Sequence, residues 1–187
     1  MYCVMYFTND WFDVSMKEVW DLMIPTLKPR KVLEIGACEG RSTCYMIAHN
    51  VDHITVIDDW HADPTVKQRF DSNIAEALTQ STTDVSVIQQ SSDSAVPQLD
   101  SDYDFVYIDG SHWSADVLLD SINAYNCLIK GGIICWDDCD RPQILPVVNW
   151  FCEQFAQSVK PITARSKTAR LVKKTHAGRL RNITYSI

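Results

Sequence analysis

The stretch KVLEIGACEGRST, residues 31–43, places a short apolar run directly before a polar turn with two glycines and the start of a helical pattern. Continuous apolar runs of this length are typical of strands that are covered on both faces. Four similar runs follow, at residues 54–58, 85–89, 104–109 and 132–137. Stretches of helical periodicity separate them, at residues 41–49, 64–79, 114–129 and 143–156. This alternation predicts an α/β fold, a Rossmann-like doubly wound domain with a mostly parallel sheet.

The flanking segments extend this predicted domain. Residues 14–27 have a helical pattern that Lys28, Pro29 and Arg30 end, so we expect an extra N-terminal helix. The segments PITAR at 161–165 and ARLVK at 169–173 predict a C-terminal antiparallel hairpin. In the helix at 114–129 an apolar face should pack on the sheet, with Asp116, Asp120 and Asn123 lying elsewhere. We expect one domain over residues 1–187, with a helical lead-in at 1–30, a ligand-binding core at 31–140 and a helix and hairpin at 141–187.

The composition excludes several classes of protein. With 187 residues, 46% of them hydrophobic and 22% charged, the chain is typical of a folded globular domain rather than of a disordered or fibrous protein. No apolar run approaches the roughly 18 to 20 residues of a membrane span, and the first ten residues lack the basic start of a secretory signal. The seven cysteines include no CxxC pair, so we interpret them as reduced thiols. We expect a cytoplasmic protein without a membrane partner.

The net charge of −7 is unevenly distributed along the chain. Residues 160–187 hold eight basic residues and no acidic one, so residues 1–159 carry 9 − 24 = −15. A body this acidic argues against a nucleic-acid partner, which needs a basic stripe. The basic C-terminal segment is either an exposed hairpin that balances the acidic body or an anion contact.

The residues that end the first three predicted strands are suited to a nucleoside. In an open parallel sheet a ligand binds beyond the carboxyl ends of the strands. Gly36 and Gly40 bracket the first turn, where glycine permits positive φ and close approach of a ligand. Asp58 ends the second strand, 22 residues after Gly36, where an acid can accept from both ribose hydroxyls. The alternative for Asp58 is an ordinary turn or cap. Ser92, after the third strand, is either close to an adenine or part of a helix cap.

The ends of the fourth and fifth predicted strands carry three carboxylates and an imidazole. Asp109 and His112 follow the run FVYI, and Asp137 and Asp138 follow IICW. Carboxylates that converge repel each other unless a cation lies between them. Oxygen ligands favour a hard ion, so we expect Mg²⁺, or Mn²⁺, at Asp109, Asp137 and Asp138. In the alternative, Asp138 and Asp140 cap the helix that begins at Pro142, and Asp109 only ends a strand.

The sequence resembles class I S-adenosylmethionine-dependent methyltransferases along most of its length. LEIGACEGRST is similar to the first motif of that family, with the ExGxxxGxS/T spacing intact, and Asp58 corresponds to its ribose acid. QQSSDSAVPQL is similar to the family segment after the third strand. The pair YIDGSH and GGIICWDD resembles the branch related to cation-dependent O-methyltransferases.

This resemblance implies a role for each matching residue. The residues around the methionine part of the cofactor would be Glu34, Gly36, Gly40, Ser42 and Thr43, while Asp58 would hold the ribose and Ser92 would lie near the adenine. Asp109, Asp137 and Asp138 would be the metal ligands. His112 occupies the position of the family's catalytic base, often lysine, and Asp109 would take part in catalysis through the metal. A second interpretation of His112 is a partner that orients Asp109.

We therefore expect an enzyme that transfers a methyl group from S-adenosylmethionine to a hydroxyl of a small molecule or sugar, assisted by a metal ion. One alternative is a nicotinamide-linked reductase, although the chain lacks the GxGxxG pattern of that class. Another is a nucleoside-binding module that has kept the fold without turnover.

Overall fold

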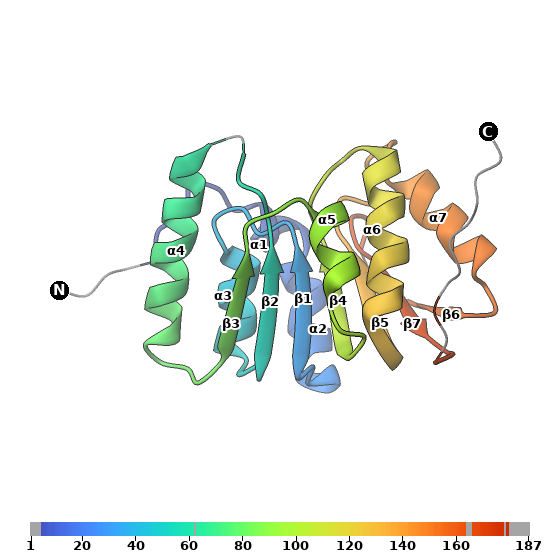
Figure 1. Cartoon of the computed structure of the whole chain (residues 1–187), viewed down its shortest axis with the longest axis horizontal. Helices are drawn as coiled ribbons and strands as arrows, with labels where there is room; N and C mark the ends of the chain where they lie inside the picture. Colours follow the sequence, from blue (N-terminus) through green and yellow to red (C-terminus); the bar gives the residue numbers. More distant parts are fainter. Residues whose placement is uncertain (1–4, 62, 164–165, 178, 180–187) are drawn as a thin grey trace.

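A computed structural model describes residues 5–61, 63–163, 166–177 and 179, and its centre is a seven-stranded sheet. The strand order is β3-β2-β1-β4-β5-β7-β6. Neighbouring strands are parallel from β3 to β5, and β7 runs antiparallel to both β5 and β6 (Figure 1). The strands are β1 (Lys31–Ile35), β2 (His53–Ile57), β3 (Asp84–Ile88), β4 (Tyr103–Ile108), β5 (Leu128–Trp136), β6 (Val159–Ile162) and β7 (Arg170–Lys174). The predicted fold class and the C-terminal hairpin are thus confirmed; residues 164 and 165 of the predicted hairpin lie outside the described residues.

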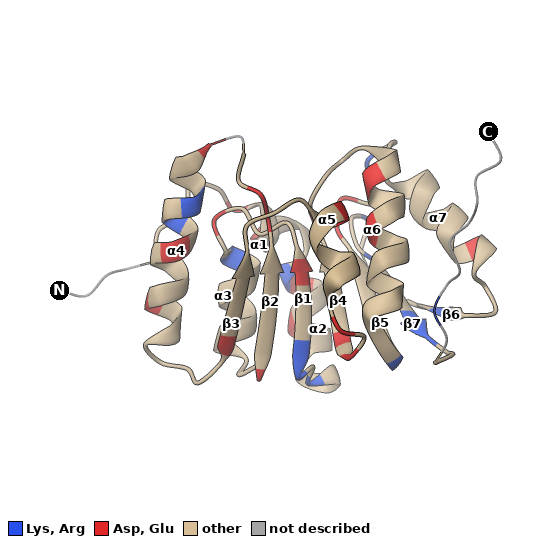
Figure 2. Ribbon diagram, in the orientation of Figure 1, with Lys and Arg blue, Asp and Glu red and all other residues tan. Residues whose placement is uncertain are grey.

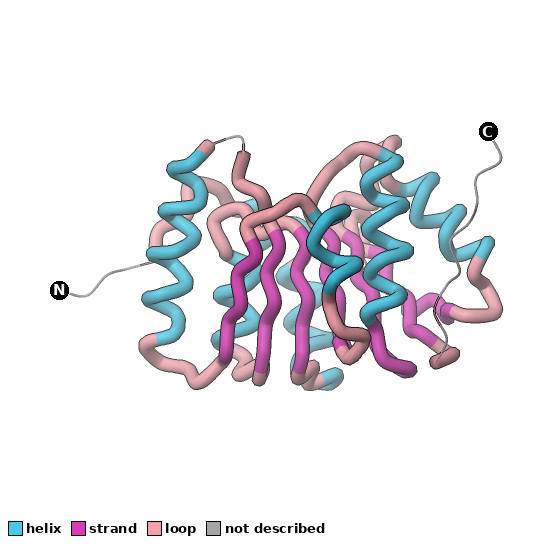
Figure 3. The backbone as a smooth tube through the Cα atoms, in the orientation of Figure 1, coloured by secondary structure: helices cyan, strands magenta, loops and turns pink. Residues whose placement is uncertain are grey.

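Helices cover both faces of the sheet (Figure 3). The sheet therefore separates the core into two clusters. One cluster joins the sheet to α1 (Trp11–Ser15), α2 (Lys17–Leu27), α3 (Arg41–Ala48) and α4 (Pro64–Leu78). The other joins it to α5 (Ser92–Ala95), the 3-10 helix η1 (Val96–Gln98), α6 (Ser114–Cys127) and α7 (Leu145–Gln154). Within the described part of the chain, no helix is long and apolar enough to cross a membrane.

The N-terminal helix differs from the prediction because it is two helices. The helical backbone is interrupted at Met16, so α1 and α2 replace the single helix expected over residues 14–27. The break allows Phe12 and Trp20 to be buried together, with ring centroids 4.9 Å apart. The predicted end is confirmed, because Lys28 adopts the left-handed conformation at φ 46° and Pro29 follows it.

Two expectations about burial were wrong. The run at residues 85–89 was expected to be covered on both faces, but β3 is an edge strand and Val87 is 40% exposed. The helix face with Asp120 was expected to lie away from the core, yet Asp120 is only 1% exposed. Because α5 and η1 lie beside α6, they cover a side of that helix that its own periodicity marks as polar.

The charges and thiols follow the predicted distribution with one exception. Acidic residues lie in the loops at the carboxyl ends of the parallel strands and also at the amino ends of β2, β3 and β4. Basic residues lie on α4, on β6 and β7 and at the amino end of β5 (Figure 2). Lys160 and Lys173 of the hairpin are exposed, but Lys174 is buried. The six cysteines among the described residues are free thiols, as predicted; Cys3 lies outside them.

Candidate functional site

Gly36 and Gly40 shape the loop between β1 and α3. Both have positive φ, of 83° and 81°. A Cβ atom at Gly36 would lie 2.2 Å from the backbone oxygen of Asp109, and one at Gly40 would lie 2.8 Å from a ring carbon of Phe70. The sequence suggested that these glycines let a ligand come close to the backbone. In the structure, the groups that come close to them are Asp109 and Phe70 of the protein itself. Because glycine lets the ends of β1 and β4 come together, it also brings the two halves of the site together.

Asp58 accepts hydrogen bonds from this glycine loop. Its Oδ2 accepts from the backbone N–H groups of Ala37, at 2.8 Å, and Cys38, at 3.0 Å, and its Oδ1 accepts from Trp60, at 2.9 Å. The side chain is partly exposed. A carboxylate has about four acceptor positions, so Asp58 holds the loop in place and keeps one position on Oδ1 for a further donor.

Glu34 lies beneath the loop with the two hydroxyl residues of the same motif. It is 2% exposed, and its oxygens accept from the hydroxyls of Ser42 and, at 2.5 Å, Thr43. Burial raises the pKa of Glu34 to about 7, although the two hydroxyls act in the opposite direction. The structure thus brings Glu34, Ser42 and Thr43 together as a buried polar group that connects β1 to the first turn of α3.

Ser92 is the first residue of α5 and lies beside α6. It lies near the carboxyl group of Asp120, whose pKa burial raises to about 6 although the Ser92 hydroxyl acts in the opposite direction. The second carboxyl oxygen of Asp120 is buried without a partner. Ser92 is partly exposed, so it sits between the protein interior and the surface where the adenine was predicted.

Tyr107, Asp109 and Asp137 form a buried polar network where β4 and β5 end. The hydroxyl of Tyr107 lies 3.1 Å from Oδ2 of Asp109 and 2.9 Å from Oδ2 of Asp137. A hydroxyl carries a single proton, so Tyr107 donates fully to only one of these carboxyl groups at a time. Burial and the charges of the neighbouring carboxylates raise the pKa of Asp109 well above its usual value, and burial raises that of Asp137.

Asp137 lines the same pocket as Asp109 and Asp138, and its carboxyl group also makes hydrogen bonds toward the N-terminal helix. Its Oδ2 also accepts from the hydroxyl of Ser15 in α1, at 2.8 Å, and its Oδ1 accepts from the backbone N–H of Asp138, at 2.7 Å. The residue is 5% exposed. Asp137 therefore connects the end of β5 to the N-terminal helix.

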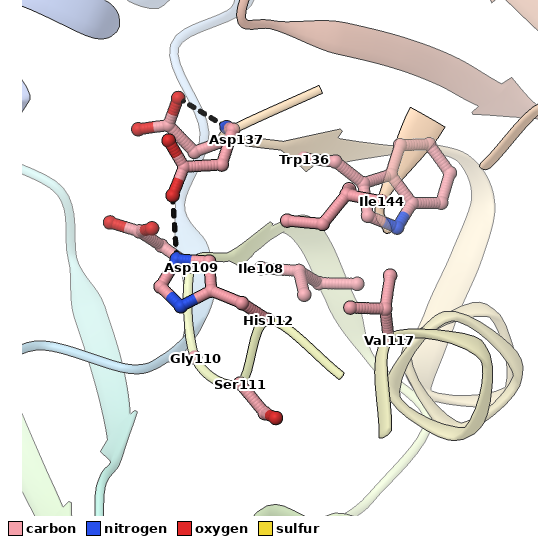
Figure 4. A pocket seen from close by; sticks show the side chains of 10 residues that line it. Ile108, Asp109, Gly110, Ser111, His112, Val117, Trp136, Asp137 and Ile144 are labelled. Carbon is pink, nitrogen blue, oxygen red and sulfur yellow. Dashed lines mark hydrogen bonds and ion pairs between the residues drawn. The ribbon is translucent and has the colours of Figure 1, made fainter. Parts of the chain in front are cut away.

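Asp109, His112 and Asp138 lie together at the surface of the site (Figure 4). One possible ligand atom from each of the three lies within 4.8 Å of the others. Nε2 of His112 is 2.6 Å from Oδ2 of Asp138, and Nε of Arg141 is 2.9 Å from the same oxygen. Asp138 has φ 53°, in the left-handed region that aspartate tolerates better than most residues. Successive aspartates thus point in different directions.

The tryptophans near the site have different environments. Trp60 and Trp136 are 6% and 1% exposed and pack in the core, the more common position of this side chain beside a sheet. Trp113, directly after His112, is 77% exposed. Of these three tryptophans, Trp113 is the one that is exposed enough to contact a bound substrate.

Sequence reasoning missed three residues that shape the site. They are Tyr107, Ser15 and Glu39. A signal existed for Tyr107, because it lies two residues before Asp109 and strand periodicity places both on one face. The contact between Ser15 and Asp137 spans 122 positions, so it depends on tertiary packing that no local pattern shows.

The fold and this two-part site define a doubly wound α/β domain with its polar groups at the carboxyl ends of the parallel strands. The chain belongs to the methyltransferase domain family, whose family model matches residues 33–139. This match and the fold confirm the resemblance to class I methyltransferases. No curated protein matches the sequence.

Solved methyltransferase structures share the fold. The O-methyltransferase from Bacillus cereus, in complex with SAH, superimposes with a TM-score of 0.67 at 19% identity, covering 87% of this chain and 83% of that one. The O-methyltransferase TomG from Streptomyces achromogenes, involved in tomaymycin synthesis and in complex with SAM, gives 0.66 at 18% identity, covering 85% and 79%. At these identities the likeness establishes the fold.

Proposed function

We propose that this protein is an S-adenosylmethionine-dependent O-methyltransferase that acts, with a divalent cation, on a hydroxyl of a small molecule or sugar. The observation that carries this proposal is the placement of two chemically different half-sites side by side in a methyltransferase domain. The Asp58 loop lies at the end of β2, and Asp109, His112 and Asp138 lie at the ends of β4 and β5. The backbone contact at Gly36 joins the two halves.

The residues of the first half-site fit the cofactor. Asp58 retains an acceptor position for a ribose hydroxyl after it has bound the loop N–H groups. Gly36, Gly40, Glu34, Ser42 and Thr43 would form the wall next to the methionine part, and Ser92 would lie near the adenine. S-adenosylmethionine, when bound, supplies a methyl group on a positively charged sulfonium. The acidic groups at this edge of the sheet would stabilise that charge.

The second half-site would bind and orient the acceptor. Asp109, Asp137 and Asp138, the ligands predicted from the sequence, lie at this edge of the sheet with the imidazole of His112. Their negative charges would favour a bound cation. A divalent cation, Mg²⁺ or Mn²⁺, when bound would favour the deprotonated hydroxyl of the acceptor. Holding acceptor and cofactor in line supplies much of the remaining rate enhancement.

His112 has two possible roles in this function. As a general base it would take the proton of the acceptor hydroxyl, as the family position implies. As a neighbour of Asp138 it would instead hold the cation. Its Nε2 is already engaged with Asp138, so the base role requires Nδ1 or a change in the pair.

The proposed partner is therefore a small molecule, and we place the protein in the cytoplasm without a nucleic-acid or membrane partner. A nicotinamide-linked reductase fits the site less well, because the turn after β1 lacks the third glycine of that class. A nucleoside-binding module without turnover would have no need of three ionisable residues gathered at the end of β4 and β5.

The experiment that tests this function measures labelled-methyl transfer from S-adenosylmethionine over a panel of hydroxyl, amine and thiol acceptors. We expect transfer to a hydroxyl, its loss after chelation and its recovery with added Mg²⁺ or Mn²⁺. Binding of the demethylated cofactor should survive chelation and should greatly exceed binding of NAD. Tight NAD binding, or cofactor binding without transfer to any acceptor, would contradict the proposal.

The same proposal predicts the effect of removing Asp58. Asp58→Ala should weaken cofactor binding by about 1 to 3 kcal/mol, as expected for lost hydrogen bonds to a charged acceptor, and should loosen the glycine loop. Asp59→Ala is the matched control, because Asp59 adjoins Asp58 but pairs with the exposed His61. Calorimetry should show nearly unchanged affinity for this control. Equal affinity of wild type and Asp58→Ala would remove Asp58 from the site.

A further inference from the structure

We infer that His112 is a nitrogen ligand of the cation, together with Asp109 and Asp138, and that Asp137 is not a ligand. This inference deepens the proposed function and rests on it for the presence of a cation. It changes both the ligand set and the class of metal ion that the sequence alone suggests. Three observations, on Asp137, on His112 and on Asp138, carry it.

Both carboxyl oxygens of Asp137 already accept hydrogen bonds from the protein. Its Oδ2 accepts from Ser15 and Tyr107, and its Oδ1 accepts from the N–H of Asp138. At 5% exposure, a turn toward the cation would leave buried hydroxyl and N–H groups without acceptors. These hydrogen bonds hold the carboxyl group of Asp137 in the protein interior, and a cation would have to compete with them.

His112 is placed to supply the third ligand of the cation in place of Asp137. It lies on the loop that leaves β4, three residues after Asp109, and its side chain is 47% exposed. The ring points at the Asp138 carboxylate, with the Asp109 carboxylate beside it (Figure 4). Ligand atoms that share an ion at bond lengths of about 2.1 Å are roughly 3 Å apart, so only a small opening of the 2.6 Å pair would admit one.

The backbone of Asp138 directs its carboxylate to this imidazole. Asp138 has a left-handed backbone with φ 53°, and its Oδ2 lies 2.6 Å from Nε2 of His112. Arg141 shares the same oxygen at 2.9 Å and would have to give way to a cation. The side chain of Arg141 is 50% exposed, so it can turn into solvent.

A site of two carboxylates and one imidazole favours a different ion from a site of three carboxylates. Mg²⁺ prefers oxygen ligands, whereas an imidazole nitrogen suits first-row transition ions. We therefore expect Mn²⁺ and the later ions Co²⁺ and Zn²⁺ to bind more tightly than Mg²⁺. Carboxylates also suit Mn²⁺, which makes it a convenient spectroscopic probe.

The test uses the full chain with Mn²⁺ alone and needs no methyl donor or acceptor. Pulsed electron paramagnetic resonance should detect coupling of bound Mn²⁺ to an imidazole nitrogen in the wild type. His112→Ala should remove this coupling and weaken Mn²⁺ binding at least about tenfold. His61→Ala is the matched control, because His61 also pairs with an aspartate at 2.6 Å but lies at the end of β2. The His61→Ala variant should keep both the nitrogen signal and the Mn²⁺ affinity.

Calorimetry should show Mn²⁺ binding at least about tenfold tighter than Mg²⁺ binding.

Several results would overturn the inference. They are bound Mn²⁺ without nitrogen coupling, equal Mn²⁺ affinity of His112→Ala and wild type, and no Mn²⁺ binding at all. His112 is exposed, so its replacement should fold, and circular dichroism verifies this. Asp138→Asn should also lose Mn²⁺ binding, whereas folded Asp137→Asn should keep its Mn²⁺ affinity within a few-fold. A large loss of Mn²⁺ affinity in Asp137→Asn would contradict the inference. Methyl transfer that persists through such a failure would leave the proposed function standing. A failed transfer assay would not affect the nitrogen signal.

Discussion

Glu34 is a buried acid whose ionisation is coupled to folding. The sequence places it in the first motif, and the structure explains its chemistry: α3 packs its first turn over β1, so two hydroxyls bind the carboxyl group while water is excluded. Burial raises its pKa from 4.5 to about 7. This property could not be predicted from the sequence, because it depends on how closely the helix covers the strand.

The first prediction concerns the pH dependence of stability. A carboxyl group whose pKa is raised on folding binds its proton more tightly in the folded chain, so its contribution to stability declines as pH rises from about 4.5 to about 7. At 1.36 kcal/mol per pKa unit, the decline is about 3 kcal/mol. Glu34→Gln should therefore gain stability relative to the wild type between pH 5 and pH 8 in urea unfolding. The exposed Glu153→Gln serves as the control; parallel pH profiles of Glu34→Gln and wild type would contradict the prediction.

The candidate site was predictable where strand ends determine position. Asp58, Asp109 and His112 follow apolar runs, and parallel topology alone brings such ends to one edge. The directions of adjacent side chains were less predictable. Asp137 and Asp138 look equivalent in the sequence, yet one accepts from Tyr107 in the interior and the other faces His112, a difference that depends on how the chain leaves β5.

The strands and helices show which local patterns were sufficient. All five predicted parallel strands exist, since each apolar run had enough β-branched residues. The start of β5 was misplaced: it begins at Leu128, inside the stretch predicted as helix, and the glycines at 131 and 132 lie within the strand rather than at or before its start. The burial of β3 was overestimated, because an apolar run does not reveal whether a strand lies at the edge of the sheet. Asp120 was misplaced for a related reason: α5 is too short for a periodic signal, yet it lies over the polar side of α6.

Lys174 illustrates how one element stabilises the end of another. In the sequence it is one of several basic residues in the C-terminal segment. In the structure Lys173 and Lys174 point to opposite faces of β7, and Lys174 is 2% exposed. Its Nζ donates to the backbone oxygens of Tyr125, at 2.9 Å, and Leu128, at 2.8 Å. Tyr125 lies in the last turn of α6 and Leu128 begins β5, so this ammonium group stabilises the junction of the two elements and interacts favourably with the helix dipole.

The second prediction is that Lys174→Met destabilises the fold by about 2 to 4 kcal/mol. Methionine has a similar length but donates nothing, so two buried carbonyl groups would lose their charge-assisted hydrogen bonds. Lys173→Met is the control, because the neighbouring lysine is exposed on the other face. Urea unfolding should separate the two variants clearly. Similar small losses in both would show that water replaces the ammonium group at the helix end.

The N-terminal segment connects parts of the molecule that are far apart in sequence. The buried amide of Asn73 in α4 accepts from the N–H of Tyr6, at 2.8 Å, and donates to the carbonyl oxygens of Tyr6 and Glu39, both at 2.9 Å. Glu39, in the glycine loop, accepts from the backbone and hydroxyl of Thr8, each at 2.7 Å, and from Arg69. Residues 6–8, the glycine loop and α4 therefore form one hydrogen-bonded unit next to the proposed cofactor.

The third prediction tests whether this unit holds the glycine loop in its binding conformation. Asn73→Ala removes three hydrogen bonds, of which the one to Glu39 is buried, so it should cost about 2 to 4 kcal/mol of stability. It should also speed hydrogen exchange at residues 6–8 and 37–41 while the β6–β7 hairpin is unaffected, since the loss is local to one end of the sheet. Under conditions where the variant is folded, affinity for the demethylated cofactor should fall several-fold, because part of the binding energy must then reorder the loop. Ser72→Ala, an exposed neighbour on the same helix, should change neither quantity. Faster exchange confined to residues 6–8, with unchanged cofactor affinity, would mean that the N-terminal segment rests on the loop without ordering it.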